Sequence, residues 1–128
     1  MKAGDTAKFK RKITKLDVAK FASLSGDKNP LHLSKSYASK TIFKKPIVHG
    51  MFLGALCSRL VGMYLPGKRC LYLSQDLSFK QPVFVGDTVE VNGRVESFSS
   101  SVRLGEVRIE ISVKGKLCAV GLAKVKIL

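Results

Sequence analysis

The sequence predicts an α+β domain in which a curved antiparallel sheet wraps around one long central helix. Residues 51–65 are apolar on nearly every side, which is typical of a helix that other elements surround. From Cys70 onward, polar and apolar residues alternate with a period of two, which indicates strands. One strand, then helices, then four strands is the element order of an α+β domain.

The N-terminal half supplies the first strand and the shorter helices. Residues 6–13 alternate loosely between polar and apolar and are expected to form the opening strand. Residues 14–17 resemble a capping box, so a helix is expected to begin there and to stop at Gly26. Ser34 is expected to cap a short helical turn, and Pro46 interrupts the chain before the apolar helix.

The C-terminal half is expected to be an antiparallel meander. Short glycine- and serine-rich connections separate its alternating segments, and such connections favour hairpins. The four expected strands are 71–79, 88–98, 102–113 and 117–127.

The length and composition are those of one globular domain over residues 1–128. The three cysteines lack metal-ligand spacing, so reduced and mostly buried thiols are expected. The longest apolar segment is too short to span a membrane, and the N-terminus lacks a secretion signal. We therefore expect a cytoplasmic protein, or one of an organelle matrix if a transit peptide has been removed, without membrane partners.

The net charge of +14 raises the possibility of nucleic-acid binding. Lysines outnumber arginines 17 to 6 and are spread along the chain without a nucleic-acid-binding motif beside them, so this function is disfavoured. A solvated basic surface explains the charge. Attraction of an acidic partner or of a phosphorylated carrier group explains it as well.

Asp27 and His32 are the clearest candidates for catalytic residues in the sequence. They are five residues apart, with Gly26 directly before Asp27 and Pro30 between the two. Glycine and proline break helices, so both side chains are expected on irregular backbone that can turn them toward one small space. A carboxylate and an imidazole so placed can move protons near neutral pH. An isolated Asp or His in a loop is more often a turn former, so the spacing alone does not establish catalysis.

Three segments resemble the MaoC-like hydratase family, especially its short (R)-specific enoyl-CoA hydratases: SGDKNPLH, KPIVHGMF and LPGKRCLYLSQDLSFKQPVFVGDTV. The resemblance covers roughly residues 4–127 and implies a hot-dog fold, usually as a homodimer. It implies reversible syn addition of water to a trans-2-enoyl thioester, giving the (R)-3-hydroxyacyl thioester. It further implies that no metal or redox cofactor is needed, and that coenzyme A or the phosphopantetheine of acyl carrier protein bears the acyl group.

By this resemblance, Asp27 and His32 match the catalytic pair, and Gly50 matches the glycine whose backbone N–H receives the thioester oxygen. The start of a long helix suits that role, because its unpaired N–H groups and its dipole favour negative charge. Asp27 is favoured as the base and His32 as the group that holds water and acts as the acid. Coupled groups can exchange protons, so the sequence leaves these two roles open.

Further residues are expected near the substrate. Asn29 is expected to order the turn through its side-chain amide and is placed with the substrate-binding residues. Ser58 and Val61 continue a stripe of small residues on the central helix, which could border the acyl pocket or serve ordinary helix-on-sheet packing. His49 is expected to brace the turn into the helix rather than to react.

Three functions remain open at this point. The first is an (R)-specific enoyl-CoA hydratase. The second is a 3-hydroxyacyl-acyl carrier protein dehydratase of fatty-acid synthesis, for which a basic surface suits an acidic protein partner. The third is a non-catalytic hot-dog protein that binds acyl thioesters or nucleic acid, and the presence of both catalytic residues disfavours it.

Overall fold

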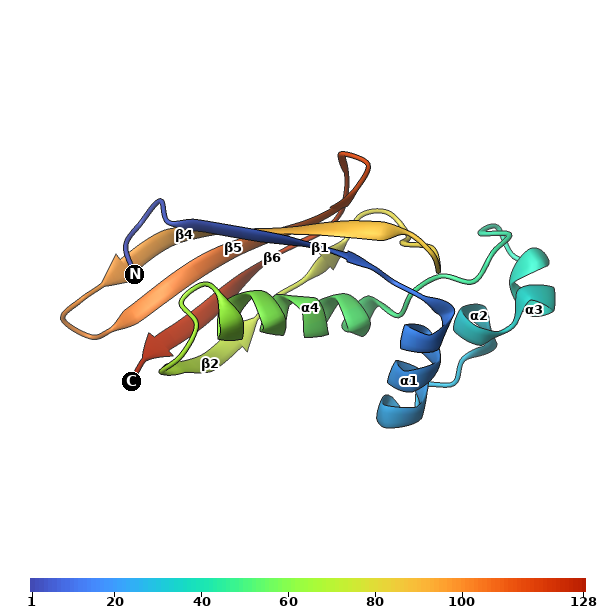
Figure 1. Cartoon of the computed structure of the whole chain (residues 1–128), viewed down its shortest axis with the longest axis horizontal. Helices are drawn as coiled ribbons and strands as arrows, with labels where there is room; N and C mark the ends of the chain where they lie inside the picture. The colour runs from blue at the N-terminus through green and yellow to red at the C-terminus, as the bar shows by residue number, and fades with distance from the viewer.

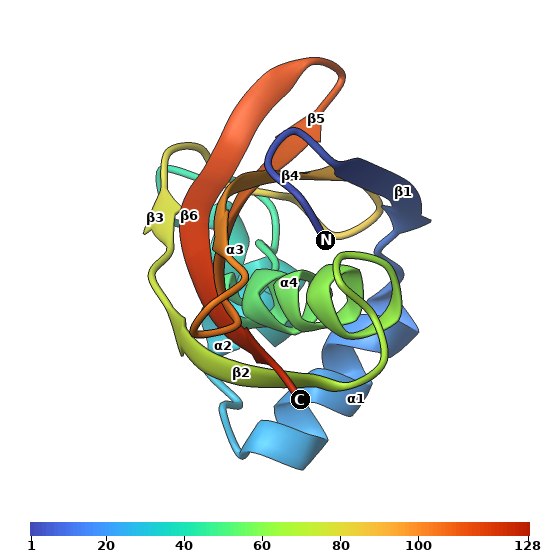
Figure 2. The same ribbon diagram turned by 90° about the vertical axis from the view of Figure 1, so that its left-hand side faces the viewer.

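An antiparallel sheet curls around helix α4 (Gly50–Met63) in the computed structural model, which describes residues 1–128 (Figure 1). The strand order is β1-β4-β5-β6-β2, and the short β3 also pairs with β6. The strands are β1 (Thr6–Lys12), β2 (Cys70–Gln75), β3 (Ser78–Phe79), β4 (Thr88–Ser99), β5 (Leu104–Val113) and β6 (Lys116–Ile127). Figure 2 shows α4 nearly end-on within the curl of the sheet. The predicted fold class, a sheet wrapped around a central helix, is confirmed.

The long strands β4, β5 and β6 form the body of the sheet. A tight turn at Lys114 and Gly115 joins β5 to β6, and both residues have a positive φ (50° and 78°), as a two-residue hairpin turn of the mirror-image type requires. The strand predicted over 102–113 begins only at Leu104. Arg103 adopts a left-handed conformation with φ 58°, so it belongs to the turn before the strand.

The strand predicted over 71–79 is wrong as one continuous element, because the chain leaves the ladder between β2 and β3. At this break the side chain of Asp76 accepts a hydrogen bond from the N–H of Leu122 at 3.1 Å. Gly121 opposite provides the space, since a Cβ there would collide with the Asp76 carbonyl. A period-two pattern carries no signal for such an interruption, because the residues around it still alternate.

One face of α4 forms the centre of the core. Leu53, Leu56 and Leu60 are buried against the concave side of the sheet. The opposite face is open, with Met51 66% exposed and Ala55, Ser58 and Gly62 also exposed. The expectation that other elements surround the helix on all sides is therefore wrong for a single chain, because the open sheet covers one side only. No helix of the structure has the length and apolar character needed to cross a bilayer.

The helix boundaries differ slightly from those predicted. Helix α4 begins at Gly50, one residue earlier than expected, because His49 already takes the N-cap position. It ends at Met63, two residues before the predicted end. Pro66 follows shortly afterwards, and the residue before a proline is disfavoured in a helix.

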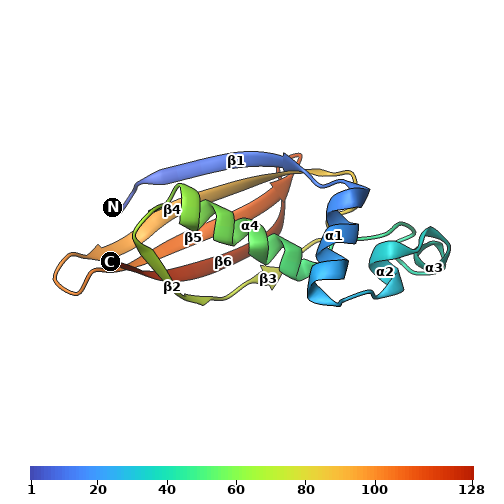
Figure 3. The same ribbon diagram turned by 60° about the horizontal axis from the view of Figure 1, so that its bottom comes forward.

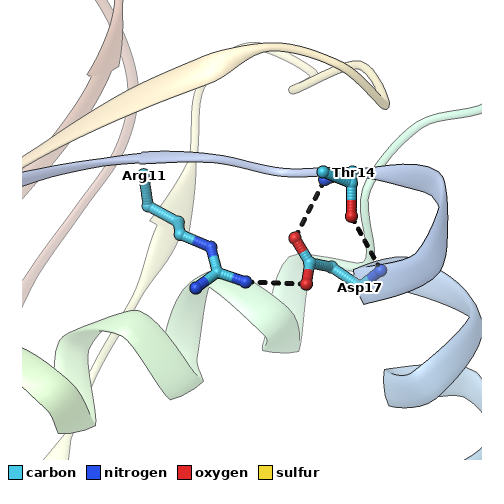
Figure 4. A network of polar contacts seen from close by, with 3 residues as sticks. All are labelled: Arg11, Thr14 and Asp17. Atoms are coloured by element: carbon cyan, nitrogen blue, oxygen red, sulfur yellow. Dashed lines mark hydrogen bonds and ion pairs between the residues drawn. The ribbon is translucent and has the colours of Figure 1, made fainter.

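Three short helices form an overhang beyond the sheet, clearest in Figure 3: α1 (Lys15–Ser25), α2 (Pro30–Leu33) and α3 (Lys35–Ser39). The predicted capping box is present at the start of α1 (Figure 4). The N–H of Asp17 donates to Thr14 Oγ1 at 3.1 Å, and the N–H of Thr14 donates to Asp17 Oδ2 at 2.9 Å. Arg11 adds an ion pair of 2.7 Å to the same carboxylate. Helix α1 ends at Gly26 as predicted, with φ 80°.

We predict that the capping box makes stability depend on pH. The backbone N–H of Thr14 lowers the pKa of Asp17 below its ordinary value of 3.8, with smaller lowering by the Thr14 hydroxyl and Arg11. A carboxyl group whose pKa is lower in the folded state contributes stability above its unfolded pKa, and that contribution disappears as the pH falls through the folded pKa. Asp17→Asn should therefore lower the free energy of unfolding at pH 7, and the deficit should shrink below about pH 4.

Urea unfolding of wild type and Asp17→Asn between pH 7 and pH 3 measures this difference. Ser23→Ala is a suitable control, since it alters an exposed residue of α1 that makes no side-chain hydrogen bond. A deficit for Asp17→Asn that stays constant down to pH 3 would contradict the prediction.

Candidate active site

A groove of about 530 Å³ lies where the overhang meets the N-terminus of α4. Asp27, His32 and Gly50 all line it, together with Phe79 of β3 and Lys80. The groove therefore brings together the three residues that the sequence predicted to take part in chemistry, from segments that are far apart along the chain.

Local hydrogen bonds set the shape of the loop that carries Asp27. Asp27 Oδ1 accepts a hydrogen bond from the N–H of Asn29 at 3.2 Å, and Ser25 Oγ accepts one from the N–H of Asp27 at 3.1 Å. Asn29 Oδ1 then accepts from the N–H of Leu31 at 3.0 Å and so caps α2. With Pro30 at the first helical position, α2 begins immediately and carries His32 in its single turn. The expectation of irregular backbone is therefore wrong for His32, because proline is accepted in the first turn of a helix.

The ring of His32 is fixed by one strong contact. Its Nδ1 lies 2.7 Å from the backbone carbonyl oxygen of Ile47. A carbonyl oxygen only accepts, so Nδ1 carries the proton and donates it in this hydrogen bond. The other nitrogen, Nε2, remains available to exchange a proton with a molecule in the groove.

His49 lies beneath both of these residues and is only 2% exposed. Its Nε2 donates to the backbone carbonyl of Asp27 at 2.9 Å, since that oxygen can only accept. Its ring stacks on His32 with a centroid distance of 3.9 Å and an interplanar angle of 25°. Phe21 of α1 packs against it with a centroid distance of 4.9 Å.

The ligand atoms of Asp27, His32 and His49 all lie within 4.8 Å of one another. That separation accommodates one water molecule that hydrogen-bonds to the Asp27 carboxylate and the His32 ring together. The same three residues fit a metal ion poorly. Lone pairs of ring nitrogens lie in the ring planes, so two nearly parallel stacked rings do not direct theirs at one ion.

Gly50 is the first residue of α4, and its backbone N–H donates to no other backbone group. It combines with the helix dipole to make this end of the groove favourable for a developing negative charge. The absence of a side chain matters here, because a Cβ at this position would lie 2.8 Å from the Phe79 ring.

The remaining predicted residues lie outside the groove lining. Asn29 orders the turn, as expected, by capping α2. Ser58 is exposed on the outer side of α4, and Val61 is fully buried in the core. His49 was expected to brace only the start of the helix, but it also holds the loop of Asp27. Its contact with Asp27 joins residues 22 positions apart, and no local pattern indicates such a contact.

The surface around the groove is basic. Residues 18–49 include most of the overhang and contain six lysines. Asp27 is the one acidic residue in this range. The six lysines form no ion pair with a carboxylate, and Lys45 instead lies over the ring of Phe84 at 4.5 Å. By contrast, the outer side of the sheet carries charges of both signs, such as the ion pair of Arg108 with Glu96.

The chain shows extensive similarity to known proteins. The family model described as a MaoC-like domain matches residues 2–116. An (R)-specific enoyl-CoA hydratase of Aeromonas caviae is 43% identical over 128 residues, covering 99% of this chain and 96% of that protein. A mitochondrial 3-hydroxyacyl-[acyl-carrier-protein] dehydratase of Arabidopsis thaliana is 32% identical, covering 89% of this chain and 66% of that protein. The solved structure of an (R)-hydratase of A. caviae involved in PHA biosynthesis superposes with a TM-score of 0.97 at 42% identity, covering 100% of this chain and 98% of that one.

Proposed function

Because this chain belongs to the MaoC-like domain family, we propose that it catalyses the reversible syn hydration of trans-2-enoyl thioesters to (R)-3-hydroxyacyl thioesters, with enoyl-CoA as substrate. The observation that carries the proposal is the groove, in which Asp27 and His32 lie beside the N-terminus of α4. A proton-transfer pair next to an anion-stabilising N–H is the arrangement that addition of water to an enoyl thioester needs.

In the proposed reaction, the thioester oxygen accepts a hydrogen bond from the N–H of Gly50. Charge that develops on this oxygen as water adds to C3 is stabilised there by the helix terminus. This interaction strengthens from the substrate to the enolate-like transition state, so it lowers the barrier rather than merely binding the substrate.

Asp27 and His32 handle the protons. Hydration releases one proton from the attacking water and consumes one at C2, so the pair begins and ends with the same number of protons. We assign the base to the Asp27 carboxylate and the acid to Nε2 of a doubly protonated His32, whose Nδ1–H stays on the Ile47 carbonyl. A proton that then passes from Asp27 to His32 restores the starting state.

The proposed reaction needs no metal or redox cofactor, because addition of water moves protons without net electron transfer. Coenzyme A, or the phosphopantetheine of acyl carrier protein, enters as the carrier of the acyl group and leaves with it. Treatment with a chelator should accordingly leave turnover unchanged.

We predict that Asp27→Asn and His32→Ala each lower kcat by at least about a hundredfold, because a general acid or base typically contributes that much. Loss of enoyl absorbance on hydration of crotonyl-CoA measures the rate, and chiral analysis tests for the (R)-product. Asp5→Asn is a matched control, since it removes a carboxylate that does not line the groove.

Circular dichroism should show an intact fold in both variants. Near-normal turnover in either one would exclude the dyad. A wild-type protein that binds crotonyl-CoA without hydrating it would instead favour the non-catalytic binding function.

Coenzyme A is the proposed carrier, and acyl carrier protein is the alternative. The more similar of the two relatives described above is named for enoyl-CoA and the less similar for acyl carrier protein, at 43% and 32% identity. The basic overhang suits the phosphates of coenzyme A and the acidic face of a carrier protein alike. Salt dependence distinguishes them, because screening weakens attraction between extended charged faces more than binding of a few phosphates.

We predict higher kcat/KM for crotonyl-CoA than for the crotonyl carrier protein, with only a modest rise in KM between low and high salt. Lys44→Glu should raise this KM several-fold, since it reverses an exposed charge next in the chain to Phe43, which lines the groove. Lys126→Glu changes the net charge equally at an exposed position of β6 and is the control. Preference for the carrier protein, with steep salt dependence, would favour the fatty-acid synthesis function.

We propose that Ser58 and Val61 influence which acyl-chain lengths the protein accepts. They lie about 12 Å or more along the axis of α4 from Gly50, at a rise of about 1.5 Å per residue. Only chains long enough to run along the helix would therefore reach them.

We also propose that two copies associate through the β2 edge of the sheet. The opposite edge, β1, carries the exposed side chains of Lys8, Lys10 and Lys12, which oppose pairing with another strand. Residues 70–79 contain no lysine or arginine, and Leu71 and Leu73 are each 48% exposed. Edge-to-edge pairing of two β2 strands would give a symmetric homodimer, as the open face of α4 also favours.

Sedimentation velocity should show a dimer, and Leu73→Lys should weaken it at least about tenfold by placing a charge in the contact. Leu24→Lys, at an 89% exposed leucine of α1 outside the sheet, should leave the dimer unchanged. A monomeric wild type would contradict the proposal.

We place the protein in a reducing compartment, the cytoplasm or an organelle matrix, because its three cysteines are free.

A further inference from the structure

We propose that His49 is a positioning residue for both members of the dyad, an inference that rests on the proposed function of the groove. Its Nε2–H holds the Asp27 loop by the backbone carbonyl at 2.9 Å. Its ring face supports His32 at a centroid distance of 3.9 Å. One buried side chain thus touches the backbone of one reacting residue and the ring of the other.

The hydrogen-bond partners of His49 determine its tautomer. Nε2 donates to Asp27, so it carries a proton. Nδ1 is buried and has no hydrogen-bond partner. An N–H at Nδ1 would be a buried donor without an acceptor. An unprotonated Nδ1 is only a buried acceptor without a donor, which costs less free energy. The surroundings therefore favour a neutral ring with the proton on Nε2, which presents an uncharged face to His32.

These contacts matter because small displacements of catalytic groups are costly. The Asp27 carboxylate is exposed on a loop, and the only hydrogen bond between that residue and a segment distant in sequence comes from His49. The His32 ring is held along its edge by Ile47 and across its face by His49. A displacement of about 1 Å can cost about a hundredfold in rate, so losing either contact should slow turnover.

A merely structural role is the competing explanation, since His49 also packs against Phe21 and precedes α4 as its N-cap. Two substitutions separate the explanations. His49→Phe keeps an aromatic ring beside His32 but loses the N–H. His49→Gln keeps an amide N–H near the position of Nε2 but loses the ring.

The experiment measures kcat and KM of both variants with crotonyl-CoA, alongside thermal unfolding. We expect kcat to fall about 10- to 100-fold in each variant while KM stays within about threefold, since His49 lines the groove with a side chain that is only 2% exposed. Phe52→Leu is the matched control. Phe52 packs against Phe21 in the same cluster, with a centroid distance of 5.4 Å, so its loss should lower stability and leave kcat unchanged.

Wild-type kcat in either folded variant, or a change confined to KM, would overturn the proposal. If neither variant folds, nitrogen-15 spectra of the wild-type histidines decide. A neutral His49 with its proton on Nε2 supports the proposal, and a proton on Nδ1 overturns it. These spectra need no substrate. A wild type that lacks hydratase activity but shows the expected tautomer would thus contradict the proposed function and not the position of His49.

Discussion

Helix α4 buries Leu53, Leu56 and Leu60 against the concave side of the sheet, and the rest of the structure depends on this contact. Apolar burial is the main favourable term in folding, so this packing fixes both the axis and the end of the helix. The helix therefore presents its N-terminal N–H groups at a fixed place at the end of the core. The overhang then needs only to bring proton-transfer groups to that place.

The groove illustrates how a backbone can provide chemistry that side chains cannot. Gly50 contributes an N–H and a helix terminus, with the Phe79 ring packed where a Cβ would be. The dyad is held largely through backbone carbonyls as well, with His32 donating to Ile47 and His49 donating to Asp27. Such contacts constrain the rings without adding a charge beside the reacting atoms, and the local charges are left to the lysines of the overhang.

The two edges of the sheet carry different kinds of side chain. Lysines along β1 discourage pairing, whereas β2 and the outer face of α4 leave leucine and methionine side chains exposed. Large exposed apolar surfaces on a soluble domain usually indicate a contact with another molecule. Residues 51–65 are more apolar than packing against one sheet requires, and the surplus apolar side chains lie on the open side of α4.

The sequence by itself determined the elements whose causes are local. The capping box at Thr14 and Asp17 and the end of α1 at Gly26 follow from side-chain and backbone contacts within a few residues. The motif around Asp27 and His32, read with its family resemblance, also indicated the candidate chemistry.

Only the tertiary structure decided what depends on distant contacts. The break between β2 and β3 depends on Leu122 across the sheet, and the open face of α4 depends on how far the sheet curls. The hydrogen bond from His49 to Asp27 joins two segments 22 residues apart, because local patterns specify how each segment folds and long-range burial specifies where it lies.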